Sequence, residues 1–177
     1  DNATGLKTGA AVVIYPWIGC GNCDVCANGQ ENLCSRPENL GVNNNGGFST
    51  HVIVPHKKYL FTIDDLAPSL AATYACSGLT AFSALKKAAA KVKGSRLLII
   101  GAGGVGLAAI NIAQSIIEAE IFVAEIDETK RNAAIKAGAD AVINPAEKDA
   151  SRNLSKRLGG GFPVVIDFVG SEETVRF

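Results

Sequence analysis

The stretch Arg96-Leu97-Leu98-Ile99-Ile100-Gly101-Ala102-Gly103-Gly104-Val105-Gly106 joins an apolar run to a glycine-rich turn. The apolar run over residues 96–100 predicts a buried strand, and residues 104–117 have the pattern of a helix. The glycines between them fit G-x-G-x-x-G, which indicates a dinucleotide site when it joins a strand to a helix. The first glycine then permits the tight turn, the second lets the backbone approach a pyrophosphate, and the third lets the helix pack on the strand.

A structural turn without a ligand would seldom need three glycines at this spacing, so a phosphate site at the helix N-terminus is favoured. An acidic residue is expected at the end of the next strand to hold the adenosine ribose, and Glu125 lies there, about twenty residues further on. Its carboxylate would repel the additional phosphate of NADP, which predicts NAD as the cofactor. Asp127 and Glu128 strengthen this negative field, and Arg131 weakens it. The alternative is that Glu125 is only a surface residue at a strand end.

Strands and helices alternate along the chain beyond this turn. Further strands are predicted over 119–125, 140–144 and 164–169, and helices over 128–137, capped by Gly138, and over 146–158. Continuous apolar strands in this alternation predict a doubly wound parallel sheet with helices on both faces, of the Rossmann type. Residues 68–90 are rich in alanine and leucine and predict two consecutive helices, interrupted at Gly78.

The first part of the chain has a different pattern, with short predicted strands and loops and little sign of helix. Short strands are predicted over 10–15, 48–54 and 58–63, and an irregular loop over 16–37. We therefore expect two domains, residues 1–63 with strands and loops and residues 64–177 with the parallel sheet and its leading helices.

Four cysteines lie within the irregular loop, in the pattern Cys20-x2-Cys23-x2-Cys26-x7-Cys34. Four thiolates on one short glycine-rich loop can close a tetrahedron around Zn²⁺, which is the favoured interpretation. Disulfides are a first alternative, although cysteines three apart in a tight loop rarely meet the geometry of an S–S bond. An iron–sulfur cluster is a second, although its fourth cysteine usually follows after three residues and precedes a proline.

Composition limits the classes of partner. The 177 residues are 47% hydrophobic, and seventeen basic residues balance seventeen acidic ones, so nothing indicates binding to nucleic acid. No apolar stretch reaches the ~20 residues needed to span a bilayer, so no membrane partner is expected. Free thiols suited to a metal favour a reducing compartment, the cytoplasm. The chain contains no methionine and ends just after a strand-like run, so we expect an internal portion of a longer protein.

Several motifs, taken together, carry a resemblance to a known family. These are the four-cysteine loop, the turn Gly41…Gly46-Gly47-Phe48, the segment Cys76-Ser77-Gly78-Leu79-Thr80-Ala81 and the loop Gly101–Gly106. In this order they resemble the zinc-containing medium-chain alcohol dehydrogenases over essentially the whole chain. The resemblance implies part of a GroES-like β catalytic domain with a zinc lobe up to about Ile63, followed by a Rossmann domain with four strands.

The same resemblance implies roles for individual residues. Cys20, Cys23, Cys26 and Cys34 match structural zinc ligands, and Cys76 matches a ligand of the catalytic zinc. Thr80 matches a residue beside the nicotinamide ring, and Val169 with Gly170 matches the stretch near the nicotinamide ribose. The cofactor-binding candidates are Gly101, Gly103, Gly104, Val105, Gly106, Glu125, Lys130 and Val169. Taken alone, Cys76 would be interpreted as a small buried hydrophobic residue in a helical segment.

The pattern also departs from the family. The other catalytic ligands, a cysteine and a Gly-His-Glu histidine, lie upstream of the strand with Val12 and Val13 and are not in these 177 residues. His51 and His56 match neither the histidine ligand nor the proton relay and are expected to be ordinary residues. One thiolate cannot hold a metal that needs three protein ligands, so the chain alone is expected to be inactive.

The whole protein is expected to interconvert an alcohol and an aldehyde or ketone with NAD and zinc, as a homodimer or homotetramer. Three alternatives stay open: a sibling polyol, threonine or formaldehyde dehydrogenase; a zinc-free quinone reductase, which the four cysteines disfavour; and a non-catalytic NAD- or zinc-binding redox sensor.

Overall fold

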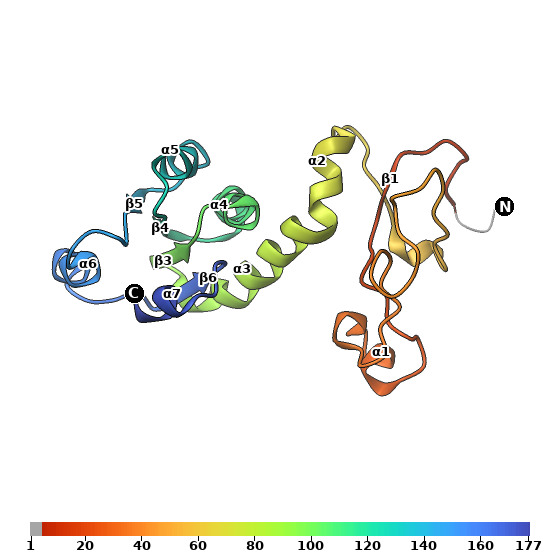
Figure 1. The fold of residues 1–177 in the computed structure, drawn as a ribbon, viewed down its shortest axis with the longest axis horizontal. Coiled ribbons are helices and arrows are strands. Elements are labelled where there is room, and N and C mark those ends of the chain that lie inside the picture. Colours follow the sequence, from red (N-terminus) through yellow and green to blue (C-terminus); the bar gives the residue numbers. More distant parts are fainter. Residues whose placement is uncertain (1–4) are drawn as a thin grey trace. The chain divides into compact units, whose positions relative to one another are not determined.

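The computed structural model describes residues 5–177, and the chain separates into two compact units, Asp1–Ala75 and Cys76–Phe177 (Figure 1). Residues 64–75, which the sequence analysis grouped with the second domain, belong to the first of these units. The domain boundary after residue 63 stays a prediction.

The first unit is built on a short antiparallel ribbon. Strand β1 (Val12–Ile14) pairs with β2 (Leu60–Thr62), with Val13 opposite Phe61. Between them lie the four-residue helix α1 (Asp24–Ala27) and the 3-10 helices η2 (Glu31–Leu33) and η3 (Lys57–Tyr59), and helix α2 (Pro68–Thr73) follows β2. The rings of Tyr15 and Tyr59 stack next to the ribbon with centroids 6.4 Å apart.

The strand predicted over residues 48–54 is wrong, because this segment has no regular structure. A β-branched apolar run forms a strand only where a neighbouring strand completes the hydrogen-bond ladder, and none of the described strands pairs with this segment. Phe48 and Ile53 are accordingly exposed. The predicted strand over 58–63 also begins late, because Lys57–Tyr59 form a 3-10 turn first.

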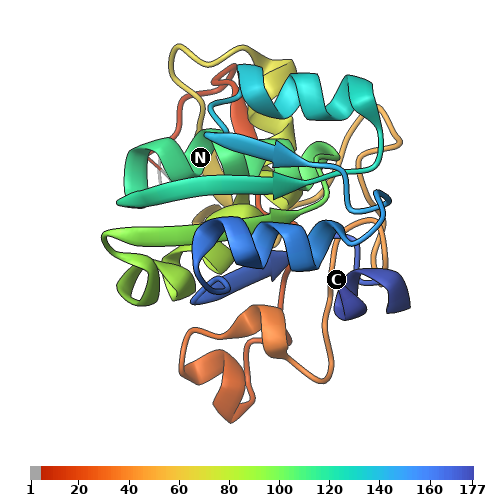
Figure 2. The ribbon, with the colours of Figure 1, turned by 90° about the vertical axis from the view of Figure 1, so that its left-hand side faces the viewer.

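The second unit begins with the π-helix η4 (Tyr74–Gly78), which crosses the unit boundary, and α3 (Leu79–Val92). There follow β3 (Ser95–Ile100), α4 (Gly104–Ile116), β4 (Ala119–Ala124), α5 (Glu128–Lys136), β5 (Ala141–Ile143), α6 (Ala150–Leu158), β6 (Val164–Asp167) and α7 (Glu172–Arg176). The strands form one parallel sheet in the order β5-β4-β3-β6 (Figure 2), so the predicted parallel sheet is confirmed.

This strand order reverses direction at one point. The chain runs outward from β3 through β4 to β5, then returns to place β6 on the other side of β3. In open parallel sheets, ligands bind outside the carboxyl ends of the strands at such a reversal. The glycine-rich turn that follows Ile100 therefore lies at the position where this fold binds its ligand.

Helices cover both faces of the sheet, as the apolar strands predicted. Alternate residues of β3 and β4 point to opposite sides, because side chains of a strand alternate. One side packs against α3, α4 and α5 through Leu97, Ile99, Ile121, Val123, Leu85, Ile110 and Ala134. The other packs against α6 through Leu98, Ile100, Phe122, Ala124 and Leu154. Burial on both faces fixes the positions of the strand ends that carry the candidate site.

Two helix boundaries differ from the prediction. Helix α6 begins at Ala150 rather than at 146, because Asp149 has a left-handed backbone (φ 58°) that no α-helix can continue. Helix α7 was not predicted, and its N-cap is Ser171, whose side chain and backbone form a capping box with Thr174. Over residues 5–177, none of the helices is long and apolar enough to cross a membrane.

Candidate metal centre and dinucleotide site

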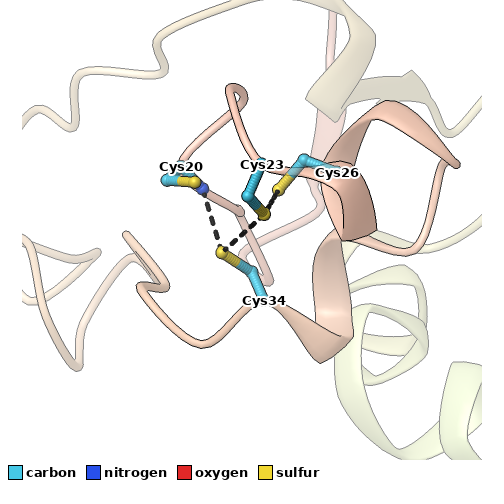
Figure 3. Close-up of side chains that lie close together, drawn as sticks. All are labelled: Cys20, Cys23, Cys26 and Cys34. Atoms are coloured by element: carbon cyan, nitrogen blue, oxygen red, sulfur yellow. Dashed lines mark hydrogen bonds between the residues drawn. The ribbon is translucent and has the colours of Figure 1, made fainter.

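The first candidate site consists of the four cysteine thiols of residues 18–38, a segment named the metal lobe. The thiol sulfurs of Cys20, Cys23, Cys26 and Cys34 all lie within 4.8 Å of one another and point toward a common centre (Figure 3). The Cys23 sulfur lies 3.5 Å from that of Cys26 and 3.9 Å from that of Cys34. A tetrahedron with Zn–S bonds of about 2.3 Å has edges of roughly 3.8 Å. The thiols are therefore spaced for a single tetrahedral metal ion.

The same distances also test the two alternatives for these cysteines, disulfide bonds and an iron–sulfur cluster. All five cysteines are free, and separations of 3.5 and 3.9 Å are far longer than the ~2.05 Å of a disulfide. An iron–sulfur cluster contains several metal ions and needs its cysteine sulfurs further apart than one ion does. The close grouping supports a single-ion site.

The lobe also supplies hydrogen-bond donors to its sulfurs. The backbone N–H groups of Cys20 and Arg36 donate to the Cys34 sulfur at 3.4 and 3.3 Å, and the Arg36 guanidinium lies 3.8 Å from the Cys20 sulfur. A hydrogen bond from the backbone of Asn22 lowers the pKa of the Cys20 thiol to about 6. Burial raises the pKa of the Cys26 thiol to about 12. A cation in the lobe would favour the thiolate form of Cys26.

The second candidate site is the loop between β3 and α4. Gly101 has a positive φ of 90°, and a Cβ at Gly106 would lie 1.9 Å from the Gly101 carbonyl oxygen. Both positions therefore require glycine. By contrast, a Cβ at Gly103 or Gly104 would meet nothing within 4 Å. The N-cap Gly103 makes no side-chain cap to the first N–H groups of α4, and a helix N-terminus of this kind could accept phosphate oxygens.

Glu125 lies directly after β4 and faces this loop. Its side chain is buried, and its carboxylate accepts hydrogen bonds from the N–H groups of Ala102, at 2.9 Å, and Asp127, at 3.0 Å. A carboxylate has about four lone-pair sites, so it retains capacity to accept further bonds, for example from ribose hydroxyls. Burial alone would raise the pKa of Glu125, but these hydrogen bonds and the nearby charge of Lys130 outweigh it and lower the pKa.

This lowered pKa predicts a dependence of stability on pH. The carboxylate stabilises the fold fully above the pKa of an unfolded glutamate, about 4.3, and this contribution is lost as the pH falls through the lower folded value. A Glu125→Gln variant should be about 1.5–3 kcal/mol less stable than the parent at pH 7, because charge-assisted hydrogen bonds weaken. Denaturant unfolding at successive pH values measures this difference, which should shrink below pH ~4. A difference that persists unchanged at low pH would contradict it.

Val169 and Asp167 shape the other wall of the loop. A Cβ on Gly101 would lie 2.6 Å from a methyl group of Val169, so the two segments are in close contact. The Asp167 carboxylate accepts hydrogen bonds from the N–H groups of Val169 and Gly170, at 2.8 and 3.0 Å, and from the Thr174 hydroxyl, at 2.6 Å. Asp167 fixes the turn that carries Val169, and no pattern in the sequence marks it for this role.

The remaining residues singled out in the sequence lie outside these two groups. Cys76 is exposed within the π-helix Tyr74–Gly78, a type of helix that is frequent at functional sites, and Thr80 is exposed one turn later in α3. The interpretation of Cys76 as a buried hydrophobic residue therefore does not hold. His51 contacts Thr50, and His56 accepts a hydrogen bond from the Lys58 N–H. Both histidines thus make local loop contacts.

Together, the thiol cluster and the glycine loop define a chain with a metal lobe and a Rossmann-type dinucleotide domain. Comparison with known families agrees. Residues 1–65 match the family described as "Alcohol dehydrogenase GroES-like domain", and residues 104–177 match the family described as "Zinc-binding dehydrogenase". The chain belongs to the zinc-containing medium-chain dehydrogenase/reductase family, which confirms the resemblance found in the sequence.

Individual relatives support the assignment. The NAD-dependent alcohol dehydrogenase of Sulfolobus acidocaldarius is 38% identical over 98% of this chain and 50% of its own length. The crystal structure of D-arabinose dehydrogenase from Sulfolobus solfataricus has a TM-score of 0.87 at 31% identity, covering 96% of this chain and 54% of that one. The alcohol dehydrogenase of Aeropyrum pernix has a TM-score of 0.85 at 30% identity, with coverage of 97% and 51%. The chain thus spans about half the length of the relatives it matches.

Proposed function

We propose that this chain is part of an NAD- and zinc-dependent oxidoreductase that interconverts an alcohol and an aldehyde or ketone. The observation that carries the proposal is the open glycine loop at the mouth of α4, with the buried Glu125 carboxylate beside it. This pair lies at the carboxyl end of the sheet, next to the reversal of strand order. A diphosphate on the loop and ribose hydroxyls on Glu125 would use both features at once.

Residues along the sheet edge would place the rest of the cofactor. Gly101, Gly103, Gly104, Val105 and Gly106 would hold the diphosphate, and Glu125 with Lys130 the adenosine ribose. Val169, held by Asp167 against Gly101, would contact the nicotinamide ribose, and Thr80 the ring. When bound, NAD supplies the ring that accepts a hydride from the alcohol carbon, while the hydroxyl proton leaves to solvent.

Two metal roles follow from the cysteines. Cys20, Cys23, Cys26 and Cys34 would hold a structural zinc that braces the lobe, because all four sulfurs are grouped. Cys76, exposed and separate from that cluster, would contribute one ligand to a catalytic zinc, which supplies Lewis-acid chemistry at the substrate oxygen. Thiols kept free for metals favour the cytoplasm. We further infer a homodimer or homotetramer for the full-length protein.

The experiment that tests the proposal is an oxidation assay on the full-length protein. Incubation with NAD and a panel of alcohols should produce NADH and the matching carbonyl compound, and zinc analysis should give two ions per subunit. Polyols and sugars belong in the panel, because a neighbour in structure is a D-arabinose dehydrogenase. One or no zinc ion, with no oxidation of any alcohol, would instead favour a redox-sensor module.

Glu125 should also select NAD over NADP. Like charges placed side by side cost several kcal/mol, so we expect the full-length protein to prefer NAD by on the order of 100-fold in kcat/KM. The Glu125→Gln variant keeps the side-chain size and removes the charge, and it should lose most of this preference. An unchanged preference in the variant would show that Glu125 does not face the ribose.

A further inference from the structure

A half-buried carboxylate, that of Glu31, lies within the metal lobe. The side chain of Glu31 is only 15% exposed, and it carries both the ion pair and the hydrogen bonds of this region. Its Oε2 accepts from the Tyr59 hydroxyl at 2.6 Å and from the Gly19 N–H at 3.3 Å, while its Oε1 pairs with the Lys58 ammonium. The Lys58 ammonium and the Gly19 N–H can only donate, and the Tyr59 hydroxyl donates here, so a group that accepts at both oxygens satisfies all three.

The position of Glu31 connects the two ends of the lobe. Gly19 directly precedes the first cysteine, and Glu31 opens the 3-10 helix that leads to the last, with the Cys34 N–H donating to the Glu31 carbonyl at 3.1 Å. At Gly19 the packing is tight, since a Cβ there would lie 2.6 Å from the Cys26 sulfur and 3.1 Å from the Glu31 Cβ. One side chain thus holds the start and the end of the lobe together.

The same carboxylate attaches the lobe to the ribbon. Tyr59 ends η3 immediately before β2, is buried, and stacks on Tyr15 next to β1. A lobe with four thiolates and one divalent ion already has an excess of negative charge. Because the Lys58 ammonium neutralises Glu31, the connection to the ribbon adds no further net charge.

We propose that Glu31 is the positioning residue of the metal lobe, and that its carboxylate keeps the lobe closed and thereby sets how slowly the ion leaves. This inference rests on the proposed metal site in the lobe. Release of the ion requires Cys20 and Cys34 to move apart, and that movement has to break the contacts that Glu31 makes with Gly19 and Tyr59. Groups that support ligands in this way typically change metal affinity by 10- to 100-fold when they are mutated.

The test compares the release of metal by the parent chain and by a Glu31→Gln variant, both loaded with Co²⁺. The thiolate-to-cobalt absorption band reports four-sulfur coordination, and its decay in excess chelator gives the release rate. We expect the variant to keep the band and to release Co²⁺ roughly 10- to 100-fold faster. Glu38→Gln is the matched control, since it removes an exposed negative charge from the same lobe and should leave the rate unchanged.

A second substitution, Lys58→Met, distinguishes a loss of the Glu31 hydrogen bonds from a general loss of stability. In Glu31→Gln, the new amide NH₂ must face a group that can only donate, either the Lys58 ammonium or the Gly19 N–H. Adding Lys58→Met removes the donor on one side, so the double variant should release Co²⁺ within about threefold of Lys58→Met alone. If Glu31→Gln does not fold, Tyr59→Phe replaces it, because it keeps the ring that stacks on Tyr15 and should speed release by roughly 2- to 10-fold.

The outcomes distinguish the two proposals. A parent chain that takes up no Co²⁺ overturns the metal lobe and the role of Glu31 with it. A parent that holds Co²⁺, with Glu31→Gln or Tyr59→Phe releasing it at the parent rate, overturns only the role of Glu31. Faster release that Lys58→Met fails to correct also overturns it, because the loss then does not arise from the mismatched donors.

Discussion

Replacing Gly106 with alanine should destabilise the unit formed by residues 76–177 by more than about 3 kcal/mol. The added Cβ would lie 1.9 Å from the carbonyl oxygen of Gly101 and 2.9 Å from its carbonyl carbon. Neither atom can yield, because Gly101 directly follows β3 and its N–H donates to the Ala124 carbonyl at 2.8 Å. Relief would require α4 to move away from the sheet and open the core around Ile110. Denaturant unfolding of parent and variant measures the loss.

Gly103→Ala is the matched comparison within the same loop. A Cβ at Gly103 would meet no atom within 4 Å, and its φ of −74° suits any residue, so stability should change by less than about 1 kcal/mol. The methyl group would instead occupy the space through which the loop approaches a diphosphate. We expect NADH to bind at least about tenfold more weakly in a fluorescence titration. Unchanged NADH binding in Gly103→Ala would place the diphosphate elsewhere.

The sheet and its loop could be predicted because their signals are local and mutually consistent. The apolar run over 96–100 needs cover on both sides, and the glycines that follow it are explained by contacts between near neighbours, Gly106 against Gly101. Each later strand repeats the same requirement for burial. The parallel order then follows from the alternation of strands with helices, since parallel strands need crossover connections.

The errors at residues 48–54 and at the start of α6 have a different cause. Residues 48–54 end in the β-branched run Val52-Ile53-Val54, which is typical of a strand, but a strand forms only with a partner, and pairing is a long-range property that the pattern does not contain. Helix α6 was predicted to begin too early because the left-handed backbone of Asp149 is fixed by the turn around it, not by its residue type. Local pattern therefore describes the buried unit better than the loop-rich one.

The residues of the candidate sites also differ in whether a local sequence pattern marks them. The four cysteines lie within fifteen residues, so their spacing alone predicted their grouping. Glu31 was not identified because its main partner, Tyr59, is 28 residues away, and only the fold brings the two together. Asp167 lies within the predicted strand 164–169, where nothing marks it as the acceptor of three hydrogen bonds. For Glu31, the available signal was its position as an acidic residue shortly before Cys34, the last cysteine of the lobe.

A Cys26→Ser variant should lose the metal of the lobe and, with it, the order of residues 18–38. Cys26 is buried among the other three sulfurs, and a serine hydroxyl is a poor ligand that cannot close the tetrahedron. Apart from the contacts of Glu31, little else holds this segment, since its regular structure amounts to α1 and η2. Structural zinc contributes about 10–16 kcal/mol to the folding of zinc-finger peptides at pH 7, so its loss should unfold the lobe. Zinc content and limited proteolysis measure the two effects.

Cys76→Ser provides the control, because Cys76 is exposed and belongs to the other unit. It should leave the zinc of the lobe in place and give no new cleavage between residues 18 and 38. Chelation of the parent should reproduce the cleavage pattern of Cys26→Ser, since both remove the same ion. The contrary outcome is a chelated parent that resists proteolysis while Cys26→Ser is cleaved. The substitution would then act through the packing of the buried sulfur. The contacts of Glu31 with Gly19 and Tyr59 would suffice to hold the lobe without a metal.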